Sequence, residues 1–421
     1  MKVEVPYGQT KIDFDIDESR LFNLITPKKT TPSPNPVLEV QRALMNPIES
    51  PTIESMFFRG KKVAIVVDDM SRMTPTSTLL KSILGILHEK GAKKRDVKII
   101  IALGTHRPMT TQEMKKKYGH QVVEEYEVVN HCYDDESGIQ FEGYAAENMP
   151  IWINKQYIDS DLNIVTGNIV PHYNAGWGAG AKILLPGLAG EETVGRMHVY
   201  SATTTPNGLG MDENPTRLLI DSFAHKVGVD FLVNTVTNPR GEIVHVFAGH
   251  FVKAHRAGVV YARSIFGAKT RGLSDITISS SYPADIDYWQ GLKALFSADL
   301  ATKVGGGIIE VTPCPEGLSL MHPKWIDYLQ YGTRELKEMC RQEVDDMVAL
   351  GLAMNVAYVK ERHTVCIVSD GISSKQATKI GFKKFKSLEE AIEYLSHRYG
   401  SKSEVNVLTH GGETYPLVNQ T

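Results

Sequence analysis

The residues best suited to catalysis or ligand binding lie in residues 171–201, PHYNAGWGAGAKILLPGLAGEETVGRMHVYS. The stretch contains three glycines at alternate positions: Gly176, Gly178 and Gly180. Glycine tolerates positive φ and carries no side chain, so such a loop can bring its backbone close to a ligand. Lys182 follows directly and is placed to meet a phosphate or form a covalent bond. His198, sixteen residues further on, is suited to hold a metal or act as a base.

The glycine loop admits more than one interpretation. Gly176, Gly178 and Ala181 match a relaxed dinucleotide-binding fingerprint, but residues 171–174 separate them from the preceding strand. Lys182 lacks the Ser or Thr that follows the lysine of a P-loop. The loop is therefore either a tight turn packed on a helix or a site for a phosphate-bearing ligand. We favour the second, with backbone N–H groups and the lysine as the ligand's partners.

Two polar clusters follow predicted strands of the same sheet. Residues 68–72, DDMSR, come after a buried strand at 63–67, and residues 104–107, GTHR, come after a strand at 97–103. Helical segments follow each cluster, and this alternation indicates parallel strands. Ligands of such sheets bind beyond the carboxyl ends of the strands. Both clusters lie where that rule places a site.

His106 and His172 are both predicted at the mouth of this sheet. A single histidine in such a loop is more often a polar residue with satisfied hydrogen bonds. Two of them suit a reaction that needs a proton acceptor on each face of a substrate, and racemisation has that symmetry. Arg72 either forms an ion pair with a neighbouring aspartate or holds a substrate carboxylate with its two-pronged guanidinium.

His198, and the pair Gln290 and Lys293, each have a purely structural and a chemical interpretation. His198 follows two glutamates that favour a helix start, and it is either a helix-surface residue or a metal ligand. No HxxxH or HExxH pattern surrounds it, so a metal there would take most of its ligands from a cofactor. Gln290 and Lys293 share one face of a predicted helix. That face is either exposed or, as the adjoining Trp289 suggests, close to a ligand.

Composition limits the classes of function. The chain has 421 residues and a formal net charge of −3, which gives no electrostatic case for nucleic acid or an anionic membrane. The first residues lack the apolar core of a signal peptide, and no apolar run is long enough to span a bilayer. Four scattered cysteines argue against a disulfide framework or a cysteine zinc site. A cytoplasmic protein is the default expectation.

The order of predicted elements indicates an α/β fold with two domains, each with a largely parallel sheet flanked by helices. Residues 1–265 form the expected N-terminal domain, completed by residues 400–421, because a closing strand there would otherwise have no place. Residues 270–399 form a smaller α/β domain. Its predicted helices include segments at 286–303 and 335–350.

The sequence resembles the nickel-dependent lactate racemases and their 2-hydroxyacid racemase and epimerase relatives. The resemblance covers essentially the whole chain. It rests on five motifs that follow the family's order: DDMSR (68–72), GTHRP (104–108), PHYNAGWGAGAK (171–182), RMHVYSA (196–202) and WQGLK (289–293). It implies two α/β domains with the active site in the cleft between them.

The resemblance also implies a nickel-pincer nucleotide, a pyridinium-3-thioamide-5-thiocarboxylic acid mononucleotide. By this resemblance Lys182 is linked to the cofactor through the thioamide. Nickel is held by two sulfurs and a ring carbon of the cofactor and by His198, a donor set that suits nickel. The other residues expected around the cofactor are Asp69, Ser71, Gly176, Trp177, Gly178 and Gly180. The role of the aspartate stays open.

The implied mechanism is hydride shuttling on a 2-hydroxy acid. One histidine takes the hydroxyl proton while hydride passes from the substrate carbon to the pincer ring, and hydride then returns to the other face of the keto acid. His106 and His172 match the two acid/base histidines. The residues implied for substrate binding are Arg72, Trp289, Gln290 and Lys293.

The identity of the hydroxy acid stays open in the sequence. Trp289 stands where we expect the lactate enzyme to have tyrosine, and family relatives act on lactate, malate, aryl-lactates, longer acids or sugar acids. An alternative within the family is therefore a sugar-acid epimerase. An alternative outside it is an NAD(P)-dependent 2-hydroxyacid dehydrogenase with His106 as base. A non-catalytic cofactor carrier needs only Lys182 and His198, so the further site residues argue against it. The expected partners are the proteins that synthesise the cofactor.

Overall fold

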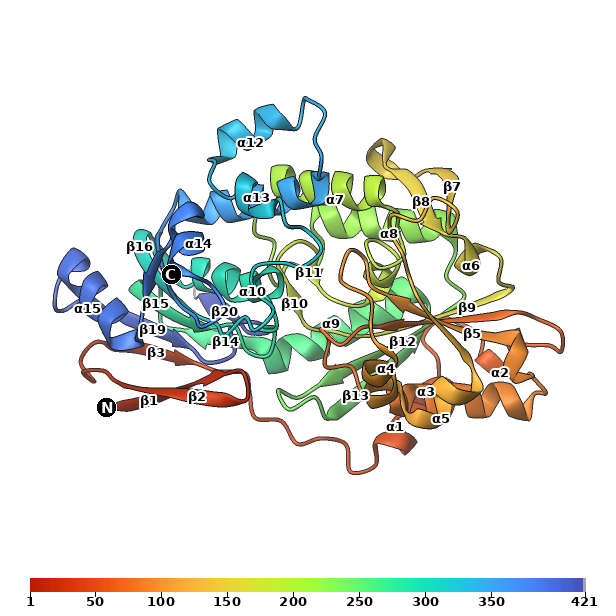
Figure 1. The fold of residues 1–421 in the computed structure, drawn as a ribbon. Helices are drawn as coiled ribbons and strands as arrows, with labels where there is room; N and C mark the ends of the chain where they lie inside the picture. Colours follow the sequence, from red (N-terminus) through yellow and green to blue (C-terminus); the bar gives the residue numbers. More distant parts are fainter. Residues whose placement is uncertain (419–421) are drawn as a thin grey trace.

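Two six-stranded sheets form the framework of the computed structural model, which describes residues 1–418 (Figure 1). The first sheet has the order β13 (Ile243–Gly249), β12 (Phe231–Thr237), β9 (Leu162–Asn168), β4 (Val63–Asp68), β5 (Val97–Ala102) and β6 (Glu127–Asn130). Strand β13 runs antiparallel to β12, and the other pairings of this sheet are parallel. The expected α/β class is confirmed.

The strands of this sheet are apolar on both faces because helices cover both faces. Along β4, Val63, Ile65 and Val67 pack in one core with helices α1 (Pro36–Met45) and α3 (Thr76–Glu89). Ala64 and Val66 face the opposite core, which includes α7 (Glu191–Thr204), α8 (Pro215–Val227) and α9 (Phe251–Phe266). The continuous apolar run of the strand therefore reflects burial on both sides.

Shorter elements complete this half of the molecule. The remaining helices are α2 (Ile53–Met56), α4 (Thr111–Tyr118), α5 (His120–Glu125), α6 (Lys155–Ile158) and the 3-10 turns at Lys94–Asp96, Ala146–Asn148 and Gly180–Ile183. Two small antiparallel pairs join β7 (Ile139–Tyr144) to β8 (Pro150–Asn154) and β10 (Pro171–His172) to β11 (Gly176–Trp177). The second pair carries the glycine loop.

The second sheet is parallel throughout the pairings described. Its order is β18 (Lys383–Phe385), β17 (Thr364–Val368), β16 (Thr302–Val311), β15 (Ser274–Ser280), β19 (Val405–Leu408) and β3 (Leu21–Ile25). The helices of this half are α10 (Tyr288–Asp299), α11 (Trp325–Tyr328), α12 (Thr333–Met339), α13 (Met347–Lys360), α14 (Ser374–Lys379) and α15 (Leu388–Tyr399). A separate parallel pair joins β14 (Gly267–Thr270) to β20 (Tyr415–Val418).

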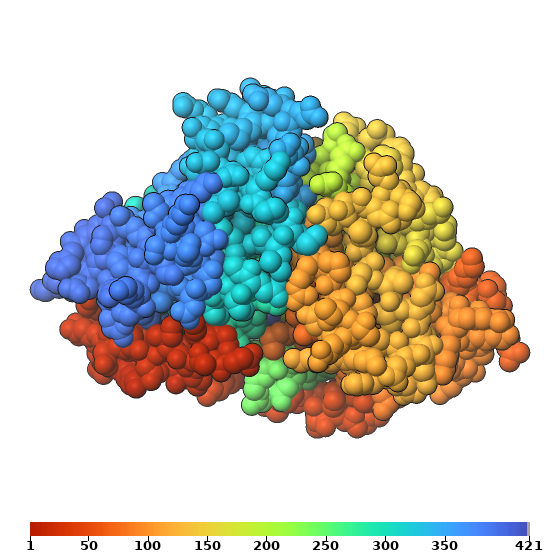
Figure 2. All heavy atoms as spheres, viewed as in Figure 1, coloured from red at the N-terminus to blue at the C-terminus, as the bar shows by residue number. Residues whose placement is uncertain are grey.

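The strand pairing corrects the expected place of the chain ends. Residues 400–421 were expected to complete the first domain, but β19 lies in the second sheet between β15 and β3. The N-terminal hairpin of β1 (Lys2–Tyr7) and β2 (Thr10–Asp15) also packs on this sheet, in the core that contains Ile276. In Figure 2 the red N-terminal residues accordingly lie against the blue C-terminal ones. Pattern alone misplaced the closing strand because its partner at the sheet edge, β3, lies nearly four hundred residues earlier. Residues 419–421 lie outside the described residues.

Two predicted helices have different bounds. The segment at 335–350 is split into α12 and α13, because the polar residues 340–346 separate them and Asp346 begins a new helix by accepting the Ala349 N–H at 2.9 Å. The helix predicted at 286–303 is shorter, since Asp287 caps the start of α10 by accepting the Gln290 N–H at 2.8 Å.

Helices α7 and α13 join the two halves and lie side by side in Figure 1. Each contributes a glycine to the crossing. A Cβ on Gly351 of α13 would lie 2.8 Å from the Cβ of His198, and a Cβ on Gly195 of α7 would lie 2.8 Å from that of Met347. The helix backbones are therefore in direct contact beside His198.

No helix within residues 1–418 combines the length and the apolar composition that a membrane crossing requires.

Candidate active site

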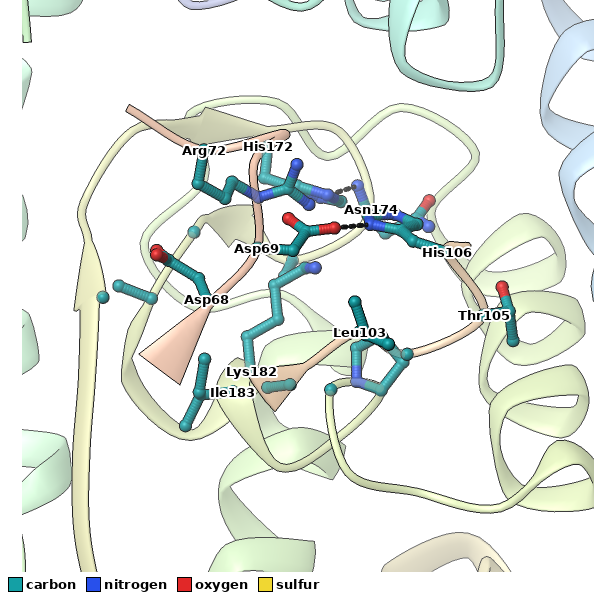
Figure 3. Close-up of a pocket in the computed structure, with 18 of the residues that line it drawn as sticks. Asp68, Asp69, Arg72, Leu103, Thr105, His106, His172, Asn174, Lys182 and Ile183 are labelled. Atoms are coloured by element: carbon teal, nitrogen blue, oxygen red, sulfur yellow. Dashed lines mark hydrogen bonds and ion pairs between the residues drawn. The ribbon is translucent and has the colours of Figure 1, made fainter. Parts of the chain in front are cut away.

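A cavity lies between the carboxyl ends of β4, β5 and β9 and the start of α10. It therefore occupies the junction of the two halves, at the sheet edge where α/β proteins bind ligands. The predicted site residues that line it are Asp69, Arg72, His106, His172, Gly178, Lys182, His198, Trp289, Gln290 and Lys293. Figure 3 shows several of them, with Lys182 extending towards Asp69.

Four predicted residues lie outside the lining of this cavity: Ser71, Gly176, Trp177 and Gly180. Packing accounts for two of the glycines. Both adopt positive φ, and an added Cβ would lie 1.8 Å from the Met211 carbonyl oxygen at Gly176 and 2.8 Å from the His255 ring at Gly180. Trp177 is buried and packs edge-on against Tyr415. Gly178 is therefore the glycine of this loop that lines the cavity. Gly176 and Gly180 instead pack closely against other parts of the protein.

Asp69 fixes the orientation of His106. Its Oδ2 lies 2.6 Å from Nδ1 of the histidine, and its Oδ1 accepts the Ser71 hydroxyl at 2.6 Å. Burial alone would raise the pKa of Asp69, but the charge and hydrogen bond of His106, with Arg72 and Ser71, hold it well below its usual value. The aspartate is therefore ionised and accepts the Nδ1 proton, which leaves the lone pair of the histidine on Nε2.

Gln290 ties the second half of the molecule to these groups. Its amide N–H donates to Nε2 of His106 at 2.9 Å. Its Oε1 accepts from Nη1 of Arg72 and from Nζ of Lys293, each at 2.9 Å. Arg72 also donates to the Ser71 hydroxyl at 2.8 Å. An acidic ligand that displaced the glutamine carbonyl would meet two cations and a proton acceptor together.

Asn174 lies between the other two histidines. Its backbone N–H donates to Nδ1 of His172 at 3.2 Å, and its amide lies 3.3 Å from Nδ1 of His198. Burial, with the nearby charge of Lys182, lowers the pKa of His198 to about 3. Burial and the surrounding cations likewise hold the pKa of His172 well below its usual value. Both imidazoles are neutral at neutral pH and carry a lone pair.

The two cavity lysines have depressed pKa values. Burial, followed by the charges of Arg72 and Lys293, lowers the pKa of Lys182 well below its ordinary value. Burial and the charge of Arg72 lower the pKa of Lys293 to about 7. The neutral amine of Lys182 is the form that can make a covalent bond. Lys293 is charged in about half of the molecules at neutral pH.

The donor set suits a metal that brings its own ligands. Within residues 1–418, no cluster of three or more His, Cys, Asp or Glu side chains is arranged to hold a metal ion. His198 faces the cavity as a single neutral imidazole. The buried Oδ1 of Asn174 has no partner among the described residues. Turning that amide over lets Oδ1 accept Nδ1–H of His198, which frees the Nε2 lone pair for a metal.

Comparison with known proteins agrees with this geometry. The family model of the lactate racemase N-terminal domain matches residues 7–210, and that of the lactate racemase C-terminal domain matches residues 270–413. The chain belongs to the lactate racemase family. The lactate racemases of Thermoanaerobacterium thermosaccharolyticum and Lactiplantibacillus plantarum are 28% and 27% identical to it. Each match covers 97% of this chain and 97% or 98% of the relative.

Solved structures of lactate racemase and of a more distant protein share the fold. The lactate racemase apoprotein from T. thermosaccharolyticum matches with a TM-score of 0.90 and 27% identity, over 99% of this chain and 100% of that one. A crystal structure of a Thermotoga maritima protein matches with a TM-score of 0.71 and 18% identity, over 91% and 97% of the two chains. The second likeness concerns the fold alone.

Sequence reasoning overlooked two residues near the site. Asn174 lies inside a quoted motif, but only the structure shows that it touches both His172 and His198. His322 stacks on Trp289 with ring centroids 4.3 Å apart, and its Nδ1 lies 2.8 Å from Asp346 Oδ2. No local pattern marks this histidine, because its partner lies 24 residues away. The motif could have revealed Asn174, since polar residues beside a predicted ligand often orient it.

Proposed function

We propose that this protein is an isomerase that interconverts the two C2 configurations of a small 2-hydroxy acid. The proposed route is reversible hydride transfer to a nickel-pincer nucleotide, with two histidines as acid and base. The observation that supports it most is that His106 and His172 line one cavity together with Arg72 and Lys182. The lactate racemase relatives supply the reaction class.

Substrate binding begins with the carboxylate. In this proposal the carboxylate takes the place of the Gln290 carbonyl oxygen beside Arg72 and Lys293. A guanidinium can hold a carboxylate through two N–H groups, which fixes the orientation of C2 as well as its distance. Lys293 is buried and Arg72 is half-buried, which limits water at this contact and strengthens it.

In this proposal His106 and His172 then transfer the proton of the substrate hydroxyl group. Because Nδ1 of His106 donates to Asp69, its Nε2 accepts the hydroxyl proton once the substrate displaces the Gln290 amide. Asp69 stabilises the imidazolium that forms. His172 is neutral at neutral pH. In this proposal its Nδ1 serves as acceptor for the opposite enantiomer once the hydrogen bond from the Asn174 N–H is released. The pair thus provides a base for each configuration.

The cofactor contacts follow from the two remaining groups. Burial depresses the pKa of the Lys182 amine, which suits this amine to the thioamide link, and the neutral imidazole of His198 is suited to the nickel. When bound, the nickel-pincer nucleotide supplies the hydride acceptor for C2. We further propose that the partners are the cofactor-synthesis proteins and that the compartment is the cytoplasm, which the four free cysteines support.

The test is the intact mass and nickel content of protein co-expressed with the cofactor-synthesis proteins, together with racemisation of 2-hydroxy acids. We expect an added mass on the peptide of Lys182 and stoichiometric nickel. His198→Ala should lose nickel, and Lys182→Ala should lose the adduct. His106→Ala and His172→Ala should keep both but lose turnover. Racemisation without nickel or adduct would overturn the proposal, and NAD(P)-dependent oxidation would favour a dehydrogenase.

A further inference from the structure

A second cavity adjoins the first. The two share His106, Trp289 and Gln290 as walls. The second cavity lies next to the proposed base, but it is not lined by Arg72, Lys182 or His198. A substrate held by Arg72 and His106 would therefore have this cavity beside its C2 atom, on the side away from Lys182 and His198.

The free walls of the second cavity are largely apolar. Met70, Met109, Ile286, Leu320 and Met321 form the apolar part of these walls, and Ser71, Arg107, Asp287, Glu316, Ser319 and His322 also line the cavity. Three of the apolar residues are methionines, whose unbranched thioether chains adapt to the shape of an apolar ligand. The apolar part of the walls favours a hydrocarbon group.

The cations of this cavity are already paired. Nη2 of Arg107 lies 2.8 Å from Oε1 of Glu113 and 2.9 Å from Oε1 of Glu316. Nδ1 of His322 lies 2.8 Å from Asp346 Oδ2. A second carboxylate, as in a dicarboxylic hydroxy acid, would find no unpaired cation among the described residues that line the cavity, and it would lie near Asp287 and Glu316.

The wall between the two cavities is held rigidly. The Trp289 indole stacks on His322 at 4.3 Å with an interplanar angle of 10°, and Trp325 packs against it at 4.9 Å and 68°. Asp346, which holds His322, is also the N-cap of α13. Trp289 is therefore a fixed surface against which a flat or branched group can lie.

Resting on the proposed function, we propose that the second cavity takes the side chain of the hydroxy acid and that this side chain is apolar and larger than methyl. The substrate class is then branched-chain or aromatic 2-hydroxy acids. Trp289 and Met321 act as specificity-determining residues. Lactate would leave the apolar part of the cavity empty, and malate would place a negative charge in it near Asp287 and Glu316.

The test compares kcat/KM of the nickel-loaded enzyme for lactate, 2-hydroxy-4-methylpentanoate, 3-phenyllactate and malate. We expect at least about tenfold higher values for the two larger apolar acids than for lactate, and the lowest value for malate. Met321→Trp should fill the cavity and lower the value for 3-phenyllactate about tenfold more than that for lactate. Met45→Trp, at a surface methionine that is 69% exposed, is the control and should change neither.

Calorimetric binding of each racemic acid, which the enzyme cannot deplete, gives a second readout. We expect the same order of affinity and the same loss in Met321→Trp. A preference for lactate or malate, or an equal effect of Met321→Trp on all four acids, would overturn this inference alone. Failure to racemise any acid by fully loaded protein would overturn the proposed function as well.

Discussion

Asp69 and His106 form the contact on which the proposed proton transfer depends most. The aspartate is ionised and accepts Nδ1–H, so the histidine presents its Nε2 lone pair to the cavity. An asparagine has nearly the same shape but can offer its amide N–H to Nδ1, which would favour the wrong tautomer. The residue thus acts through charge and orientation, which a matched substitution can separate from packing.

We expect Asp69→Asn to lower kcat by about 10²–10⁴-fold, the range that general acid–base catalysis contributes. Nickel content and melting temperature should stay near those of the unchanged protein, because the shape of the side chain is kept. Racemisation kinetics and metal analysis on the same preparation check this. An asparagine variant with full kcat would show that His106 needs no carboxylate partner.

Asn174 is expected to hold His198 for its metal. We predict that Asn174→Ala weakens nickel retention by about 10–100-fold, the usual effect of removing a group that orients a ligand. Asn168→Ala is the control, since this asparagine also lines the cavity but bonds to Thr237. Nickel loss during dialysis against a chelator measures the effect. Equal losses in the two variants would assign the change to packing.

Lys293 should make substrate capture sensitive to pH. Its pKa is lowered to about 7, so its charged form, which suits a carboxylate, is lost as the pH rises through that value. We expect kcat/KM to fall above about pH 7, by up to about tenfold per pH unit. Lys293→Arg keeps its charge over this range, so its profile should lack that fall. Identical profiles for the two proteins would exclude Lys293 as the titrating group.

At the scale of elements, the crossing of α7 and α13 sets the position of His198. The two helices come from different halves, and Gly351 allows the backbone of one to touch the other beside the histidine. The crossing therefore links the packing of the second half to the geometry of the proposed nickel ligand.

Gly351→Ala should move α7 or α13 by a few tenths of an ångström or more, because the new methyl group would lie 2.8 Å from His198 Cβ and 2.7 Å from the Val199 nitrogen. Overpacking of this kind costs about 1–3 kcal/mol of stability. We expect a lower melting temperature and reduced nickel retention. Gly85→Ala is the matched control, since nothing lies within 4 Å of a Cβ there. Nickel retention unchanged in Gly351→Ala would separate the crossing from the metal site.

The elements differ in how far the sequence could predict them. β4 and β5 were predicted nearly to the residue because their apolar runs are continuous and their ends are polar. The break between α12 and α13 was missed, since it depends on the cap at Asp346 rather than on periodicity. The sequence could not explain why positions 176 and 180 are glycines. The residues that pack against them, Met211 and His255, lie elsewhere in the chain.

At the scale of the molecule, side chains of both halves meet across the candidate site. Arg107, directly after His106, pairs with Glu316 of the second half, and Arg72 bonds to Gln290. The motifs in the sequence contain most of the residues that line the first cavity. The second cavity was not predicted, because most of its apolar wall residues, Met109, Ile286, Leu320 and Met321, lie outside the motifs.

Glu316→Gln should loosen this junction slightly. The pair with Arg107 is partly exposed, with side-chain exposures of 29% and 26%, so it contributes no more than about 1 kcal/mol. We expect KM to rise by up to about fivefold and kcat to change little, since Arg107 keeps Glu113. The difference should vanish at high ionic strength. A change in kcat that persists in salt would indicate a role other than pairing.

The position of β3 at the edge of the second sheet has a consequence for synthesis of the chain. β3 leaves the ribosome well before its partner β19, which is made almost four hundred residues later. The first sheet, with strands between residues 63 and 249, can form while the N-terminal segment still waits. A nascent chain arrested near residue 270 should therefore hold a protease-resistant middle and a cleavable N-terminus. The second sheet would then form only after β19 has been made.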